Sequence, residues 1–257
     1  MTDIDLREPT TIDHLISPHA PLLRTALDAY WQDCHDGRNP AFGPCLLHGP
    51  AGLGKRLAAR ILAQELGLET LEILASTAWR SSEVGEFFFD AYSRGAAIII
   101  LCDAPMVPLV IQDRFYYAVK IGLLTVRHSA GHMETIRFDL RRCPILLCCT
   151  EPRMGERVLS QFRLRLGFGP YNKQQMDQIV RQRAGLMAWS LADEGVSQIV
   201  GASKGRPGLA VQVLRTSWMV CRAGGRSRIS GDDVSQAVRL LEDQGSSRRS
   251  SKRSASR

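Results

Sequence analysis

The sequence predicts an α/β fold: a parallel sheet of five strands with helices around it, followed by a small all-helical domain. Short runs of consecutive apolar residues are typical of strands that are buried on both faces of a parallel sheet. The first two runs enclose a glycine-rich turn and a segment with apolar residues at helical spacing, which together make a strand–helix–strand unit. The runs lie at Cys45–His48, Leu71–Leu74, Ala97–Cys102, Pro144–Thr150 and near Phe162–Phe168.

The remaining elements are expected to be helical. The helix of the first unit should cover Arg56–Leu66 and end at Gly67, because glycine accepts a positive φ without a steric penalty. After Phe168 no further strand is evident. Ser230, with Asp233 three residues later, is the predicted N-cap of the last helix. The C-terminal helices are expected over Asn172–Leu191, Gly208–Arg222 and Asp232–Leu241.

These elements divide the chain into an α/β domain over residues 1–170, a helical lid over residues 171–244 and a basic tail over residues 245–257. The net charge is +7, but five cations and no acidic residue lie in the tail, so the rest of the chain is nearly neutral. We expect the tail to be disordered. It either contacts DNA or only aids solubility.

Composition excludes several classes of protein. Hydrophobic residues make up 44% and charged residues 23% of the chain, as in ordinary globular proteins. No apolar run approaches the roughly 20 residues that a membrane span needs. Residues 1–8 contain Asp3, Asp5 and Glu8 and no apolar block, so they do not form a secretory signal. A cytoplasmic protein without a membrane partner is therefore expected.

The cysteines and histidines do not predict a metal site. The seven cysteines contain no C-x-x-C pair and no disulfide-scaffold spacing. His128 and His132 are spaced as zinc ligands can be, but no second pair completes a site. Reduced thiols and no metal are the expectation.

The most informative stretch is Gly49–Arg56, which fits the pattern G-x-x-x-x-G-K between a strand and a helix. Its glycines let backbone N–H groups turn toward phosphate oxygens, and the start of the helix adds a partial positive charge. Lys55 would contact the β- and γ-phosphates. The pattern predicts that ATP or ADP binds at Gly49, Pro50, Ala51, Gly52, Leu53, Gly54, Lys55 and Arg56.

Two residues near this loop depart from what phosphoryl transfer requires. The residue after the lysine is normally Ser or Thr, whose hydroxyl coordinates Mg²⁺. Here it is Arg56, which has no lone pair for a metal, and this argues against a bound Mg²⁺. Asp103 follows an apolar strand, as in the acidic motif that faces Mg²⁺. Ala104 stands where catalytic proteins of this kind carry a Glu that activates water.

The chain resembles the motor of the Holliday-junction branch-migration helicases, the RuvB family of AAA+ proteins. The resemblance runs from about Leu6 to Asp243 and rests on LREPTTIDHLI near the N-terminus, on LLHGPAGLGK and on Ile99–Asp103. It implies an AAA+ P-loop domain with a helical lid. It places Ile12 in the segment that lies against the adenine. It also implies that the family's winged-helix DNA-binding domain is missing here, replaced by the basic tail.

The same resemblance assigns further roles. Thr150 would sense the γ-phosphate, and a hairpin over Leu123–Leu140 would contact other AAA+ subunits or a DNA-processing partner. Gln161 stands where the family has an arginine finger, and Gly208 where the lid has a sensor arginine. Loss of a finger alone lowers turnover by about 10³–10⁵-fold. Four catalytic positions are thus altered: Arg56, Ala104, Gln161 and Gly208.

Four functional hypotheses remain open. The leading one is an AAA+ subunit that binds ATP, hydrolyses it weakly or not at all, and acts in DNA recombination, repair or replication. The second is an active DNA-dependent ATPase or helicase motor, for which a shifted alignment offers Arg163 or Arg165 as the finger. The third is a clamp-loader subunit similar to the bacterial delta-prime protein, whose lid resembles residues 205–210. The fourth is a scaffold that binds no nucleotide.

Overall fold

The computed structural model describes residues 7–254, except residues 41, 76–80, 103–108, 128–132, 138 and 140–142. The described chain forms two compact units. One is Pro9–Gly169, and the other consists of the residues from Pro170 onward together with Arg7 and Glu8.

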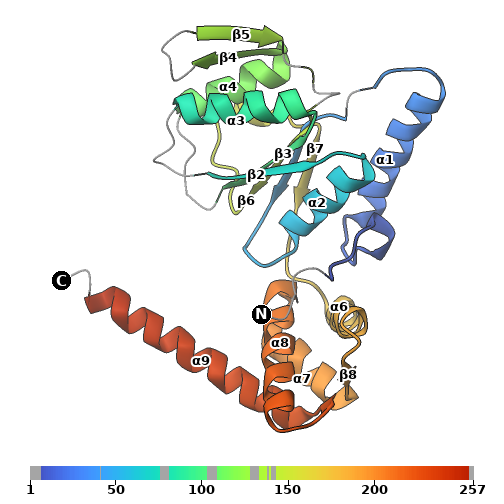
Figure 1. Cartoon of the computed structure of the whole chain (residues 1–257), viewed down its shortest axis with the longest axis vertical. Coiled ribbons are helices and arrows are strands. Elements are labelled where there is room, and N and C mark those ends of the chain that lie inside the picture. Colours follow the sequence, from blue (N-terminus) through green and yellow to red (C-terminus); the bar gives the residue numbers. More distant parts are fainter. Residues whose placement is uncertain are drawn as a thin grey trace. The chain divides into compact units, whose positions relative to one another are not determined.

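The first unit contains the predicted five-stranded parallel sheet, in the order β2-β3-β6-β1-β7 (Figure 1). Leu47 on β1 pairs with Cys148 on one side and with Leu166 on the other. The central strands are buried along their length, which explains why they appear in the sequence as consecutive apolar residues. The strands are β1 (Cys45–His48), β2 (Thr70–Ala75), β3 (Ala97–Cys102), β6 (Ile145–Cys149) and β7 (Leu164–Gly167).

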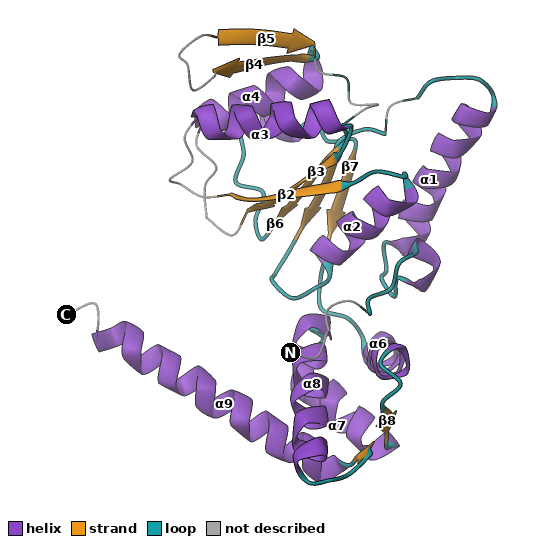
Figure 2. Ribbon diagram, in the orientation of Figure 1, coloured by secondary structure: helices purple, strands orange, loops and turns teal. Residues whose placement is uncertain are grey.

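Helices cover both faces of this sheet (Figure 2). The helices α1 (Ala20–His35) and α2 (Lys55–Glu65) lie on one face, and α3 (Ser81–Arg94) and α4 (Leu109–Lys120) lie on the other. The short helices η2 (Ile12–His14) and α5 (Glu156–Leu159) complete the unit. The core against α3 and α4 includes Phe88, Ile98 and Leu147, each at most 1% exposed.

The end of α2 follows the prediction. The helix ends at Glu65, and Gly67 has a φ of 73°. Leu68 N–H then donates to the Ala63 carbonyl at 3.0 Å, which closes the last turn.

The predicted hairpin is present as two antiparallel strands, β4 (Leu123–Arg127) and β5 (Met133–Arg137). Thr125 faces Thr135 across the pair. The residues that join the strands, and Phe138 and Leu140 beyond them, lie outside the described residues.

The second unit is built mainly from helices. They are α6 (Lys173–Leu186), α7 (Asp193–Ser203), α8 (Pro207–Ala223) and α9 (Gly231–Ser254). The α9 N-terminus has the predicted cap: Asp233 N–H donates to Ser230 Oγ at 3.4 Å, and Ser230 N–H and Oγ–H donate to Asp233 Oδ2 at 2.9 and 2.8 Å. This satisfies polar groups that the first turn leaves without partners.

Three expectations for this unit were wrong. The helix predicted over Asn172–Leu191 ends at Leu186, and Ala188 has a φ of 53°, which a helix does not accept. Two short parallel strands follow, β8 (Ser190–Leu191) and β9 (Arg228–Ile229), where no strand was expected. The helix α7 was missed, although its buried Val196, Ile199, Val200 and Ser203 have helical spacing.

Two segments differ from the predicted division of the chain. The helix α9 continues to Ser254, into the segment expected to be disordered. Ser, Arg and Lys do not oppose a helix strongly, so the helix passes Gly245. Arg7 and Glu8 pack on the C-terminal unit, because Arg183 donates to the Arg7 carbonyl at 3.1 Å and pairs with Glu8 at 3.4 Å.

Among the described residues, no helix has the length and hydropathy that would let it cross a membrane.

Candidate functional site

The phosphate loop leaves β1 through glycines in left-handed or similar conformations. Gly49, Gly52 and Gly54 have φ values of 131°, 80° and 84°. A Cβ at Gly49 would lie 2.1 Å from the Phe168 carbonyl oxygen, closer than any non-bonded contact allows. A residue with a side chain therefore cannot replace Gly49 without moving β7.

Hydrogen bonds at the carboxyl ends of three neighbouring strands hold this loop. Gly49 N–H donates to the carbonyl oxygens of Cys149 and Thr150, at 3.2 and 3.1 Å. On the other side, Phe168 N–H donates to the His48 carbonyl at 2.7 Å. The loop thus begins at the edge where ligands of open parallel sheets bind.

Lys55 begins α2 and turns its side chain back into the loop. The residue is only 9% exposed. Its Nζ donates to the carbonyl oxygens of Gly49 and Pro50, both at 2.7 Å. A buried ammonium needs such partners, and the result is a fixed positive charge inside the loop.

A cavity of about 260 Å³ lies over the loop and the end of β6. The lining includes residues of the loop, Lys55 and Thr150, but no acidic residue among those described. Polar backbone groups and cations at the start of a helix favour a phosphate ligand. The lining residues are Ala51, Gly52, Leu53, Gly54, Lys55, Arg56, Leu57, Cys148, Cys149 and Thr150.

The cysteines of this lining were not predicted to be at the site. Cys149 is 4% exposed, and burial raises the pKa of its thiol to about 11, although Lys55 acts in the opposite direction. The sequence contained a usable signal, because Cys148 and Cys149 directly precede Thr150 on the strand beside β1.

Arg56 lines the cavity but its guanidinium pairs with a carboxylate. Glu72 on β2 forms ion pairs with both Arg56 and Arg60. The two arginines are one turn apart on α2, so they reach the same carboxylate. Sequence reasoning missed Glu72, because nothing in the pattern shows that β2 lies beside this face of α2.

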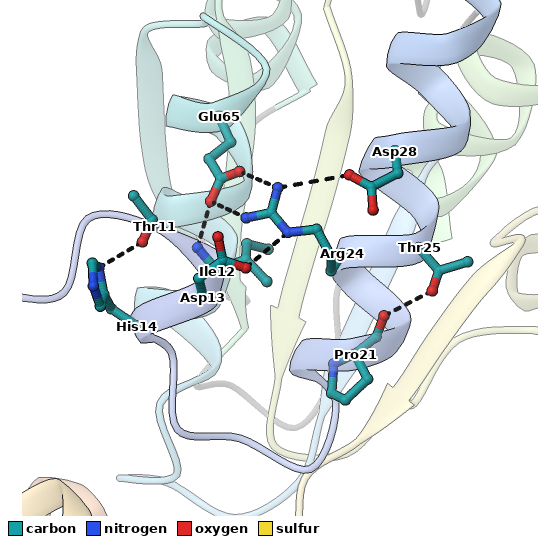
Figure 3. A network of polar contacts seen from close by, with 9 residues as sticks. All are labelled: Thr11, Ile12, Asp13, His14, Pro21, Arg24, Thr25, Asp28 and Glu65. Carbon is teal, nitrogen blue, oxygen red and sulfur yellow. Dashed lines mark hydrogen bonds and ion pairs between the residues drawn. The ribbon is translucent and has the colours of Figure 1, made fainter.

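Ile12 is not among the residues that line the cavity. It is 2% exposed on η2, and its backbone N–H donates to the Glu65 carboxylate of α2 (Figure 3). Arg24 of α1 binds the same carboxylate at 3.0 Å and Asp13 at 3.0 Å. This network fixes the N-terminal segment against α1 and α2, and the predicted adenine contact of Ile12 stays a prediction.

The other predicted catalytic positions are spread over the chain. Gln161 follows α5, where its Nε2 donates to the Arg157 carbonyl at 3.2 Å and to Ser160 Oγ at 3.0 Å. Gly208 lies in the first turn of α8, in the second unit. Asp103 and Ala104 lie outside the described residues.

The shifted candidates for the finger do not extend the site. Arg163 and Arg165 are exposed, while Leu166 is buried, so the arginines line one face of the strand region. His128 and His132 lie outside the described residues. Within the described part of the chain, no three His, Cys, Asp or Glu side chains are grouped as metal ligands.

Comparisons with known proteins show what the chain is similar to. Residues 45–104 match the family model "ATPase family associated with various cellular activities (AAA)". These residues run from β1 through the phosphate loop to the end of β3 and the residues after it. The fold and the phosphate loop are together those of an AAA+ P-loop domain.

More narrowly, the chain is similar to RuvB proteins. The Holliday junction branch migration complex subunit RuvB of Oleidesulfovibrio alaskensis is 27% identical over 216 residues, 82% of this chain and 65% of that protein. The Thermotoga maritima RuvB Holliday junction branch migration motor has the same fold, with a TM-score of 0.71 at 21% identity, over 91% of this chain and 73% of that one. A mutant of Thermotoga maritima RuvB gives a TM-score of 0.73 at 19% identity with the same coverage.

Proposed function

We propose that this chain binds ATP or ADP through Gly49–Arg56 and serves as a weakly hydrolysing or inactive subunit of an AAA+ assembly that acts on DNA. The observation that carries the proposal is the phosphate loop with Lys55 inside it. Three glycines with positive φ and an ammonium fixed on the loop carbonyls form a cradle for phosphate.

Weak hydrolysis is expected because two groups that phosphoryl transfer requires are replaced in this chain. Arg56 cannot ligate a metal, and Gln161 is neutral where an arginine would stabilise the charge that develops on a transferring phosphate. Its side chain also bonds to its own helix end. These differences act on the transition state, so binding survives while turnover falls.

A role in DNA recombination or repair is inferred from the relative RuvB, a Holliday junction branch migration complex subunit. Two features support partners for this chain. Exposed apolar residues gather where α4 meets β4, namely Tyr117, Ile121 and Leu123, which are 45%, 49% and 40% exposed. We assign this surface, with the hairpin at residues 123–140, to contact with other AAA+ subunits or a DNA-processing protein. The basic residues of the tail are assigned to DNA.

Nucleotide binding is tested by thermal unfolding with ATP and with ADP. A ligand at about 100 times its dissociation constant adds about 2.7 kcal/mol to the free energy of unfolding. For a chain of this size the expected rise in Tm is about 5–11 °C. Lys55→Ala should abolish the rise. An equal rise in Lys55→Ala, or none in the wild type, would contradict nucleotide binding at this loop.

A further inference from the structure

The phosphate loop carries a guanidinium at the position where loops of this kind present a hydroxyl to Mg²⁺. Arg56 follows Lys55 directly and lines the cavity. A guanidinium has five N–H donors, a permanent charge and no lone pair for a metal. Arg56 therefore cannot ligate Mg²⁺ as a hydroxyl does. Its N–H groups can instead bind an anion.

The guanidinium of Arg56 is paired with a carboxylate on β2. Glu72 is only 17% exposed, and it forms ion pairs with both Arg56 and Arg60. The three side chains together carry one net positive charge. With Lys55, this cluster places two more cations than anions around the start of α2.

The shared carboxylate lets Arg56 change partners. A largely buried carboxylate that loses its only cation is strongly disfavoured. Here Arg60 remains paired with Glu72 when Arg56 turns away. The Arg56 side chain is 52% exposed, so it has room to move, and solvent around the exposed guanidinium weakens its ion pair with Glu72. Two parallel N–H···O bonds to a phosphate are stronger.

We propose that Arg56 takes the place of the divalent cation in this site. When a nucleotide binds, the Arg56 guanidinium leaves Glu72 and pairs with the phosphates. Nucleotide binding is then independent of Mg²⁺. A metal-free nucleotide carries more negative charge than its magnesium complex, and Lys55 with Arg56 supplies the compensating charge. This inference deepens the nucleotide binding proposed above and rests on it.

The first experiment is calorimetric titration of the full chain with ATP and with ADP, once in excess Mg²⁺ and once in excess EDTA. We expect the two Kd values to agree within about threefold, which corresponds to about 0.7 kcal/mol. Binding at least about tenfold weaker in EDTA, or about 1.4 kcal/mol, would overturn the inference and leave the proposed nucleotide binding intact. No binding in either buffer would overturn both. This comparison uses the wild type, so it does not depend on how a variant folds.

Variants then test the two residues. Arg56→Thr restores the hydroxyl, so its binding should become dependent on Mg²⁺. Arg94→Thr removes the same charge from an exposed ion-paired arginine that does not line the cavity, and it should leave the Mg²⁺ independence unchanged. Equal behaviour of the two variants would show that Arg56 has no special role.

Glu72→Gln keeps the shape of the side chain but releases Arg56, so metal-free binding should become several-fold tighter. A residue that only supports the fold would not produce a gain. In the Arg56→Thr background the same change should have no such effect, because no guanidinium remains to be released. An equal gain in both backgrounds, or a loss in the wild-type background, would overturn the role of Glu72.

Discussion

The carbonyl oxygen of Phe168 lies 2.1 Å from the point where any residue other than glycine would place its Cβ at position 49. Gly49 also has a φ of 131°, which residues with a side chain rarely adopt. Gly49→Ala should therefore destabilise the first unit, through both backbone strain and contact with β7. We expect a loss larger than the roughly 1–3 kcal/mol of backbone strain alone, measured by urea unfolding.

Gly67→Ala is the matched control for this change. Gly67 also has a positive φ, 73°, but no atom lies within 4 Å of its added Cβ. This variant should lose only about 1–2 kcal/mol. Equal losses of unfolding free energy in the two variants would show that the contact with Phe168 does not contribute to the effect of Gly49→Ala.

The network in Figure 3 predicts unequal roles for two acidic residues that both bind Arg24. Glu65 is 16% exposed and accepts from Ile12 N–H and from Arg24. Glu65→Ala leaves these donors without this partner and should lower the free energy of unfolding by about 1–3 kcal/mol.

Asp28→Ala is the control, because Asp28 is 65% exposed and 3.8 Å from Arg24. Its effect should stay within about 0.5 kcal/mol. A larger loss for Asp28→Ala than for Glu65→Ala in thermal or urea unfolding would contradict the importance of the buried carboxylate.

ATP hydrolysis should be slow, even with DNA present. Ala104→Glu alone should recover little, because Arg56 still stands at the metal position. The pair Ala104→Glu with Arg56→Thr is the sharper test, and it still lacks an arginine finger unless a partner supplies one. Phosphate release is the measurement. Wild-type turnover in the usual range of about 1–10³ s⁻¹, abolished by Lys55→Ala, would mean that other groups perform the catalysis.

The basic tail predicts a salt-dependent affinity for DNA. Truncation after Gln244 removes five cations, which would give a slope of about −4.5 in a plot of log K against log salt concentration. We expect weaker binding and a flatter slope in the truncated chain, measured by fluorescence anisotropy. Unchanged affinity and slope would leave the tail with only a solubilising role.

The thiol of Cys149 should be unreactive in the folded protein at neutral pH. Burial raises its pKa from 9.0 to about 11, so the folded state favours the neutral thiol. The stability that this shift contributes is complete below about pH 9 and is lost as the pH rises through about 11. Mass spectrometry after iodoacetamide treatment measures this directly. Rapid alkylation of Cys149 at pH 7 without unfolding would contradict it.

The strands and the phosphate loop were predictable because their signals are local. A strand buried on both faces must be apolar at consecutive positions, and β1 and β3 have the predicted bounds. The loop pattern Gly49–Arg56 requires glycines for its backbone conformation, and the structure has positive φ at all three of its glycines. The cap formed by Ser230 and Asp233 spans only three residues, so the sequence also contained it.

The wrong predictions concern features that depend on contacts between residues far apart in the sequence. The helix predicted over residues 172–191 ends early beside two strands that pair residues 190–191 with residues 228–229, a contact that no local pattern contains. Arg7 and Glu8 belong to the second unit because Arg183 binds them across more than 170 residues of sequence.

The amino-acid sequence by itself determined the parallel sheet, the phosphate loop and the presence of a guanidinium after Lys55, because each depends on residue types within a few positions. Only the tertiary structure decided that Arg56 would share Glu72 with Arg60 and that Cys149 would line the cavity. These relations depend on which strand lies beside which helix. Packing of the whole sheet sets that order, and no short segment encodes it.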